Sequence, residues 1–298
     1  MRITFSEPKW AHELTFIAEL LCSCRELGHL VSGTDADGDL HIQWGAEPKR
    51  DIPALYCELG WLPRWSYQLS HTGINHQHHR QGERLPTLTD AQRGKVHSLF
   101  QDVRRGVGAP RRWGYLDMTA LPATSVPRKF VLAPLQMEQD TNMENVPGAL
   151  RTNEGFINAV TTHVAATLGE TPIVFKQHPH TEARPQLGLK TWRKQDEVYA
   201  HRTAGIHSLL KHPGCVAVVA CNSNSLIESL LWGVPAMAMG GGIWPKDAFL
   251  ETLNDIDLWP LGAAYRDALA WWLNDVQWTI TQAREPERVA EAIRQAPC

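Results

Sequence analysis

The chain has 298 residues, a formal net charge of −3 and 43% hydrophobic residues, a composition typical of a folded globular protein. This charge gives no overall attraction for nucleic acid or an anionic membrane, although a local patch can still provide one. No apolar run is long enough to span a bilayer, and the first residues lack the basic and apolar sections of a secretory signal. We therefore expect a cytoplasmic protein with enough residues for two ordinary α/β domains.

Residues 1–125 contain a series of elements that predicts an N-terminal α/β domain. The expected elements are a strand over 2–6, a helix from about Trp10 to near Gly28, strands over 29–32, 39–44 and 52–58, and a helix over 89–103. The stretch 61–87 is irregular, and the Gly-, Pro- and Arg-rich stretch 104–127 is interpreted as a linker into a second domain. Cys22 and Cys24 fall within the first helix, which favours reduced core thiols over disulfides.

Residues 126–262 alternate regularly between apolar strands and amphipathic helices, which predicts a second domain. The expected order is a strand over 129–135, a helix over 156–168, a strand over 172–176, a helix near 197–210, a strand over 216–220, a helix over 225–232 and a strand over 235–239. Such an order predicts a parallel sheet with helices on both faces. The remaining residues, 263–298, are helical and rich in tryptophan, and we expect them to pack across the seam between the domains.

Three polar segments follow strands of the second domain: Gln136–Asp140, Lys176–His180 and Asn222–Ser225. In open α/β sheets, ligands bind at the carboxyl ends of the strands, next to the N-termini of helices. The three segments are therefore expected to meet in one ligand site.

The third segment, Asn222–Ser225, begins a helix and suits a phosphate group, while Glu228 can accept hydrogen bonds from ribose hydroxyls. The same residues also have the form of an ordinary Ser-x-x-Glu capping box that binds no ligand. Lys176 and His178 can neutralise a diphosphate or donate to a leaving oxygen, although loop histidines are usually just solvated.

In the first segment, Asp140 is a candidate general base, nucleophile or anchor for sugar hydroxyls, and Gln136 a donor to substrate. The ordinary interpretation is a generic polar loop. No group of histidines, cysteines and carboxylates has the spacing of a convincing metal site, so no metal is expected.

Basic residues are concentrated between Arg80 and Lys129, where Arg111 and Arg112 occur beside Trp113. This stretch can form a local face for DNA, a charged glycan or a phosphate. A solvated loop is an equally good explanation.

Five groups of short motifs occur in order between about residues 57 and 280. They are Cys57-Glu-Leu-Gly-Trp-Leu-Pro-Arg64 with Thr72-Gly-Ile-Asn75, Pro134-Leu-Gln136 with Asp140, Lys176-Gln-His-Pro179, Asn222-Ser-Asn-Ser225 with Glu228 and Gly233-x-Pro235, and Leu269-Ala-Trp-Trp-Leu with Gln277-Trp-Thr279. In residues and in order they resemble the motifs of the Kps-type capsule-polysaccharide glycosyltransferases and their compact phage relatives. The resemblance implies a GT-B-like architecture, in which two Rossmann-like domains with parallel sheets are joined by a C-terminal helix that crosses between them.

The resemblance also implies the roles of individual residues. Asp140 or Glu58 is expected to be the catalytic carboxylate. The residues expected to bind the donor are Gln136, Lys176, His178, Asn222, Ser223, Ser225 and Glu228. The residues expected on the acceptor side are Asn75, Arg64, Arg111 and Arg112. The implied co-substrate is a CMP- or UDP-linked sugar, and no other cofactor is expected.

The sequence therefore predicts a glycosyltransferase that moves a sugar from a nucleotide-sugar to a hydroxyl. The expected acceptor is a surface glycan or, if the chain is of the phage type, a hydroxymethylated pyrimidine of DNA. Two alternatives are a nucleotide-sugar epimerase or hydrolase on the same scaffold, and a non-catalytic nucleic-acid-binding protein that uses the arginine-rich linker.

Overall fold

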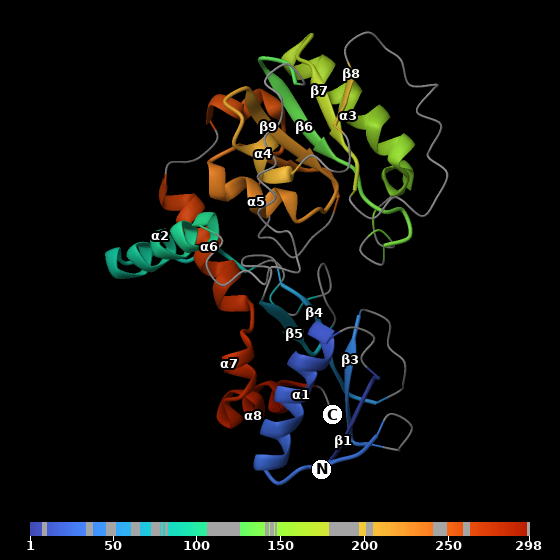
Figure 1. Cartoon of the computed structure of the whole chain (residues 1–298), viewed down its shortest axis with the longest axis vertical. Coiled ribbons are helices and arrows are strands. Elements are labelled where there is room, and N and C mark those ends of the chain that lie inside the picture. The colour runs from blue at the N-terminus through green and yellow to red at the C-terminus, as the bar shows by residue number, and fades with distance from the viewer. Residues whose placement is uncertain are drawn as a thin grey trace. The chain divides into compact units, whose positions relative to one another are not determined.

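A computed structural model of the protein describes residues 1–7, 11–33, 38–45, 52–60, 66–72, 78, 80, 83–105, 126–140, 143, 146, 148–178, 197–200, 205–240, 249–258 and 263–296. The chain forms two compact units (Figure 1). The first consists chiefly of Met1–Pro86 and Ala270–Cys298, and the second of Thr87–Gly242 and Lys246–Leu269. No helix in the described part of the chain is long and apolar enough to cross a membrane.

The N-terminal unit contains a five-stranded sheet in the order β2-β1-β3-β4-β5. The strands are β1 Arg2–Phe5, β2 Leu30–Val31, β3 Leu40–Trp44, β4 Ala54–Leu59 and β5 Tyr67–Ser70. The first four pair in parallel as expected, but β5 pairs antiparallel with β4. This fifth strand lies in a stretch whose sequence is irregular. Its backbone is also held by Trp278, which exchanges two 2.7 Å hydrogen bonds with Tyr67.

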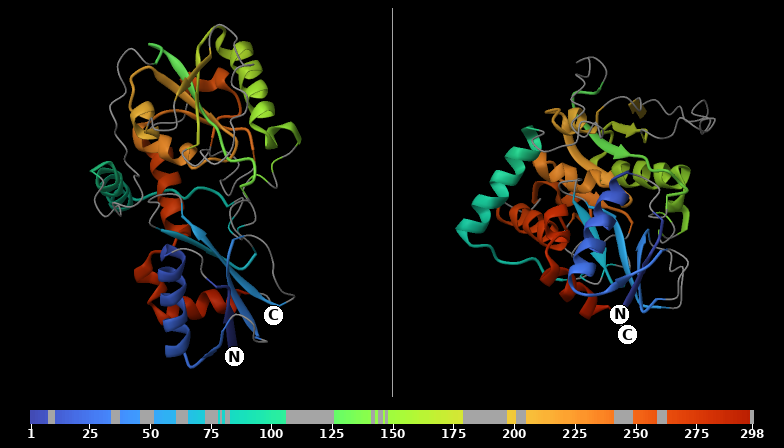
Figure 2. Two further views of the ribbon diagram at one scale, coloured as in Figure 1. Left: turned by 45° about the vertical axis from the view of Figure 1, so that its right-hand side comes forward. Right: turned by 60° about the horizontal axis from the view of Figure 1, so that its bottom comes forward.

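One face of the N-terminal sheet is covered by α1 (Ala11–Glu26) together with the last two helices, α7 (Ile280–Ala283) and α8 (Pro286–Gln295), as Figures 1 and 2 show. Residues of α8 share a core with α1 and the sheet, and the Phe16 ring stacks on Tyr67 at 4.1 Å. The end of the chain thus completes the unit with which it begins. All five described cysteines are free; Cys24 is in this core as expected, but Cys22 is exposed.

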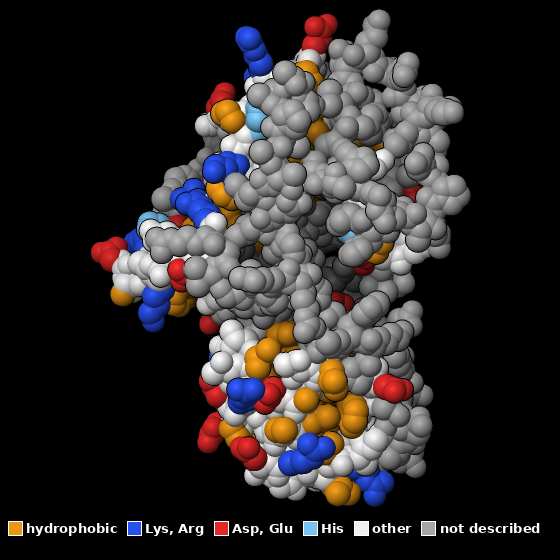
Figure 3. Space-filling view, viewed as in Figure 1, with side chains coloured by type: hydrophobic (Ala, Val, Ile, Leu, Met, Phe, Trp, Pro, Cys, Tyr) orange, Lys and Arg blue, Asp and Glu red, His pale blue; other side chains and the backbone are white. Residues whose placement is uncertain are grey.

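Hydrophobic side chains are also visible on the surface of the N-terminal unit (Figure 3). The large hydrophobic residues with the greatest exposure in the described chain are Met1, Leu14 and Leu30. Along the described part of α1, Ile17, Leu21 and Cys24 are buried together with Phe16 and Leu20, whereas Leu14 is exposed.

The second unit contains a parallel sheet in the order β10-β9-β6-β7-β8. Its strands are β6 Phe130–Pro134, β7 Ile173–Lys176, β8 Glu197–Ala200, β9 Cys215–Ala220 and β10 Ala236–Ala238. Its helices include α3 Asn153–Leu168, α4 Ile206–Leu210 and α5 Ser225–Trp232, with 3-10 turns at Gly148–Arg151 and Leu253–Leu258. Val131 and Ala133 pack with α3, and Leu132, which points to the opposite face, is equally buried. Both faces of this sheet are therefore covered (Figure 1).

The helix predicted near residues 197–210 is confirmed only over its last part, α4 (Ile206–Leu210), and is wrong for residues 197–200. The structure has the edge strand β8 (Glu197–Ala200), which pairs with β7, followed by the short helix α4. The residues Val198 and Tyr199 favour a strand once a neighbouring strand offers a place for them. A four-residue edge strand is too short to show a period of its own.

Two further helices belong to the connections between the units. The helix α2 (Asp90–Arg105) confirms the helix predicted over 89–103, and it begins with a capping box in which Thr89 and Gln92 bond each other. It is grouped with the second unit, so the units divide near residue 86, before the expected limit of 125. The helix α6 (Ala263–Val276) begins in the second unit and ends in the first. That the C-terminal helices pack across a seam stays a prediction.

Candidate functional site

The carboxyl ends of three neighbouring strands carry the three polar segments. In the sheet, β6 lies between β9 and β7, so the segments that follow these strands lie side by side. Gln136 follows β6 directly after Leu135, Lys176 is the last residue of β7, and Asn222 follows β9. The parallel order of the strands therefore places these predicted site residues at one edge of the sheet.

The segments after β6 and β9 are joined by a reciprocal side-chain pair. The Gln136 side-chain nitrogen donates to Asn222 Oδ1 at 2.7 Å, and the Asn222 backbone N–H donates to Gln136 Oε1 at 3.2 Å. Both side chains are partly buried, so the pair fixes the distance between the two loops. These two predicted donor-binding residues thus also build the site.

Asn153 and Glu138 extend this network to α3, and neither was predicted as part of the site. Asn153 exchanges two hydrogen bonds with the Gln136 backbone, at 3.0 and 3.3 Å. The Glu138 carboxylate accepts the Asn153 backbone N–H at 2.7 Å, at the positive end of the α3 dipole. The only sequence signal for this contact is the Thr152-Asn153 pair at the start of the helix, where Thr152 is the N-cap and Asn153 the first helical residue.

The N-terminus of α5 is organised by serine side chains. The N-cap is Asn224, whose side chain makes no capping bond, and Ser225 is the first helical residue. Ser223 Oγ accepts the Ser225 backbone N–H at 3.2 Å and donates to Ser225 Oγ at 3.1 Å. The ordinary capping box between Ser225 and Glu228 is therefore not formed, and Glu228 has no capping role.

Glu228 is buried in the first turn of α5, with only 5% of its surface exposed. Its Oε1 lies 3.8 Å from Nε2 of His207, a buried residue of α4. His207 Nδ1 in turn accepts the indole N–H of Trp232 at 3.0 Å. His207 carries no motif, so its proximity to Glu228 had no signal in the sequence.

Lys176 and His178 lie at the end of β7. Lys176 is 5% exposed, and its ammonium donates to the Gln177 carbonyl oxygen at 2.8 Å. His178 follows two residues later and is half-buried. The structure thus places a largely buried positive charge at the edge of the sheet, where an anionic ligand would partly replace the lost hydration.

The two candidate catalytic carboxylates lie in different units. Asp140 is half-buried in the turn after β6, where its backbone N–H donates to the Met137 carbonyl at 3.0 Å. Glu58 is half-buried on β4, opposite Gln68 of β5. The predicted acceptor-side residues Arg64, Asn75, Arg111 and Arg112 lie outside the described residues. Within the described residues, no cluster of histidines, cysteines and carboxylates could hold a metal ion.

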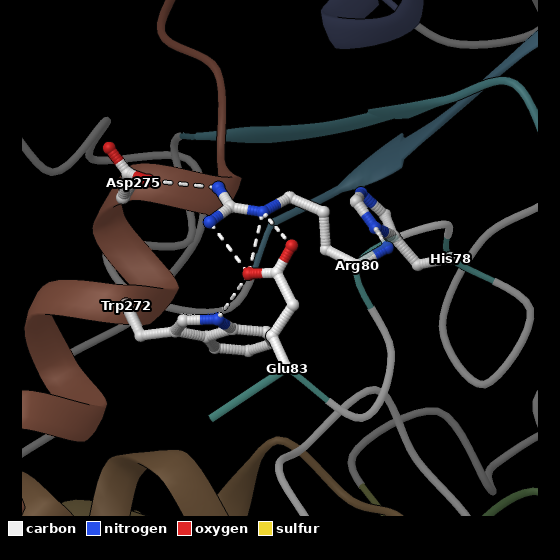
Figure 4. Close-up of polar contacts among 5 residues, drawn as sticks. All are labelled: His78, Arg80, Glu83, Trp272 and Asp275. Carbon is white, nitrogen blue, oxygen red and sulfur yellow. Dashed lines mark hydrogen bonds and ion pairs between the residues drawn. The ribbon is translucent and has the colours of Figure 1, made fainter. Parts of the chain in front are cut away.

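A groove of about 510 Å³ lies within the N-terminal unit, between β4, β5, the end of α6 and α8. On its wall, Arg80 donates to both carboxylate oxygens of Glu83 at 2.7 to 2.9 Å and to Asp275 at 2.9 Å, as Figure 4 shows. The Trp272 indole N–H also donates to Glu83, at 3.0 Å. These charged groups are paired with one another, so we interpret the cluster as a clamp that holds Arg80 and Glu83 against α6.

Two Rossmann-like α/β units in one chain define a GT-B-like fold. No protein-family model and no curated protein matches the sequence. Among solved structures, the chain is similar to Thermosulfurimonas dismutans KpsC beta Kdo 2,4 transferase, at 16% identity and a TM-score of 0.56 over 90% of each chain. It is also similar to the beta Kdo 2,7 transferase of the same organism's KpsC, at 15% identity and a TM-score of 0.51 over 90% of this chain and 88% of that one. At these identities the similarity establishes the fold, and it confirms the GT-B-like architecture that the Kps-type motifs imply.

Proposed function

We propose that the protein is a nucleotide-sugar-dependent glycosyltransferase whose donor binds at the carboxyl edge of β6, β7 and β9. The observation that carries this proposal is the Glu228 carboxylate, which is buried in the first turn of α5 without a capping role. A buried carboxylate that does not cap its helix is costly unless other groups supply hydrogen-bond donors. The two vicinal hydroxyls of a ribose are such donors.

The neighbouring groups fit the rest of a nucleotide-sugar. The Ser223 and Ser225 hydroxyls stand at the N-terminus of α5, where the helix dipole favours a phosphate. Lys176 supplies a positive charge on the other side of β6. We assign the nucleotide to Glu228, the phosphate to the two serines and Lys176, and the sugar to the Gln136–Asp140 loop.

The reaction breaks the bond between the anomeric carbon and the phosphate oxygen and forms a bond from that carbon to the acceptor oxygen. Asp140 accepts the acceptor's proton in a direct displacement, or bonds the anomeric carbon first in a two-step route. Glu58 is the second candidate for this role. The nucleotide leaves with the bonding electrons, and Lys176 with the α5 N-terminus stabilises its negative charge.

For the donor we propose a CMP- or UDP-linked sugar, and for the acceptor a hydroxyl of a surface glycan. The first test is a thermal-shift screen of the full chain against CMP, UDP, GDP, ADP and TDP. A ligand at a hundredfold excess over its Kd adds about 2.7 kcal/mol to the unfolding free energy, which is readily measured. We expect a shift with one pyrimidine nucleotide that disappears in Glu228→Gln.

Glu291→Gln, which changes an exposed carboxylate of α8, is the matched control and is expected to keep the shift. Absence of a shift with all five nucleotides would contradict the proposal. Once a donor is found, transfer is measured on glycan acceptors and on DNA containing 5-hydroxymethylcytosine. Release of free sugar or of an epimer without any acceptor would identify a hydrolase or epimerase instead.

A further inference from the structure

The Glu228 carboxylate is buried in the first turn of α5, and it does not cap that helix. It is 5% exposed, and the one described basic side chain within ion-pair distance is His207, at 3.8 Å. That distance is longer than a hydrogen bond, so His207 does not saturate the carboxylate oxygens. The carboxylate therefore keeps acceptor capacity for a ligand.

The contact with Trp232 determines which nitrogen of His207 carries the proton. An indole N–H only donates, so His207 Nδ1, which receives it at 3.0 Å, must be the unprotonated acceptor. The proton of the neutral ring is therefore on Nε2, the nitrogen that faces Glu228. With 3% of its surface exposed, His207 has little room to turn away.

The three residues form a rigid arrangement across two helices. Glu228 and Trp232 are four residues apart on α5 and thus lie on the same face of that helix, where His207 of α4 contacts both. The Trp232 ring is held by Arg104 and Lys211, whose charged groups lie 5.5 and 5.9 Å from its centre. A side chain held in this way can fix the direction of its neighbour's carboxylate.

We propose that His207, anchored by Trp232, is a positioning residue that aims Glu228 at both hydroxyls of the donor's ribose and so makes the site select ribonucleotides over 2′-deoxyribonucleotides. This inference rests on the proposed function, because it takes the α5 terminus as the nucleotide site. A 2′-deoxyribose lacks one donor and leaves a lone pair of a buried carboxylate unsatisfied. That loss corresponds to about 10- to 100-fold weaker binding.

The test is calorimetric titration of the full chain with CMP and with 2′-deoxy-CMP, or with the uridine pair if UDP gives the thermal shift. The wild-type protein is expected to prefer the ribonucleotide by at least about tenfold. In His207→Phe, ribonucleotide binding should weaken about tenfold while deoxyribonucleotide binding changes little, so the ratio approaches one.

Two further variants keep the test decisive if His207→Phe does not fold. His207→Gln keeps an N–H that can face Glu228 and an oxygen that can accept from Trp232, so it should retain the preference. Trp232→Phe removes the indole donor and should reduce the preference for the ribonucleotide. His97→Gln, an exposed histidine of α2 outside the site, is the control and should behave like the wild type.

The outcomes separate this inference from the proposed function. If neither nucleotide binds the wild-type protein, both are overturned. If the ribonucleotide and deoxyribonucleotide bind equally well, the nucleotide site stands and the role of His207 does not. A folded His207→Phe variant that keeps the full ratio would also overturn the inference.

Discussion

Each unit contains a five-stranded sheet, but the two units are built from differently placed segments of the chain. The second unit builds its parallel sheet from strands that all lie between residues 130 and 238, and each of β6, β7 and β9 ends in a polar segment at the same edge. The N-terminal unit needs residues 270–298 to complete its core, and its edge strand β5 pairs with backbone from the far end of the chain. Contiguous elements thus bring the candidate site residues together in a way that their order in the sequence predicts. The core of the N-terminal unit instead depends on contacts between the two ends of the chain.

The largest effect is expected from removing the C-terminal segment. A chain that ends at Val276 lacks Trp278, which bonds the Tyr67 backbone, and the core residues Ala283 and Val289. Since Phe16, Leu20 and the sheet would lose their cover, we expect the N-terminal unit to unfold while the second unit stays folded. Limited proteolysis with peptide mapping measures this difference.

In the truncated chain, cleavage should concentrate in residues 1–86 and spare the parallel sheet. The intact chain with Glu291→Gln, which alters only the exposed side of α8, is expected to resist cleavage in both units. Equal resistance of the truncated chain in its N-terminal unit would contradict the dependence on the C-terminal segment.

A smaller effect is expected at the clamp of the N-terminal unit. Glu83→Gln removes the charge that holds Arg80 and weakens the acceptor of the buried Trp272 indole. Because the Glu83 side chain is 40% exposed, solvent screens much of the ion pair. We expect a loss of about 1 to 2 kcal/mol in the free energy of unfolding, mainly from the indole hydrogen bond.

Denaturant unfolding followed by tryptophan fluorescence measures this loss. Glu291→Gln removes an exposed ion pair with Arg294 and should leave the transition almost unchanged. An unchanged transition for Glu83→Gln as well would show that the clamp does not stabilise the unit.

The smallest effect concerns the thiols, and it is expected to be the same in both units. Burial raises the pKa of Cys24 in the first unit, and of Cys215 and Cys221 in the second, to about 12. At pH 8 these thiols stay protonated in the folded protein and should react slowly with a thiol reagent, whereas the exposed Cys22 reacts quickly. Mass-spectrometric mapping of labelled peptides measures this, with Cys22→Ser as the control.

The raised pKa values of these thiols also make the free energy of unfolding depend on pH. Their folded pKa lies above the unfolded value of about 8.5, so between about pH 9 and 12 the folded state binds more protons than the unfolded state. The contribution of these protonated thiols to the free energy of unfolding is therefore complete below about pH 8.5, and it decreases as the pH rises from about 9 to 12. Labelling of Cys215 as fast as that of Cys22 at pH 8 would contradict the burial of Cys215 in β9.

The sequence by itself determined the parallel core of the second unit. The apolar runs that became β6, β7 and β9 are long enough to be recognised without their neighbours, and the helix predicted over 225–232 is α5. Since parallel strands share one carboxyl edge, the meeting of the polar segments after these strands also followed from their order in the chain. The capping box at Thr89 is likewise a local pattern that the structure confirms.

Tertiary structure alone decided the short edge strands and the partners of the buried polar groups. β5 and β8 are four residues each, and they are strands because an adjacent strand, and for β5 also Trp278, satisfies their backbone. Arg80 meets Asp275 across 195 positions, and Gln136 meets Asn222 across 86. The contact of His207 with Glu228 also depends on how two helices pack. A hydrogen bond or a desolvated charge depends on which group lies opposite, and local sequence does not carry that information.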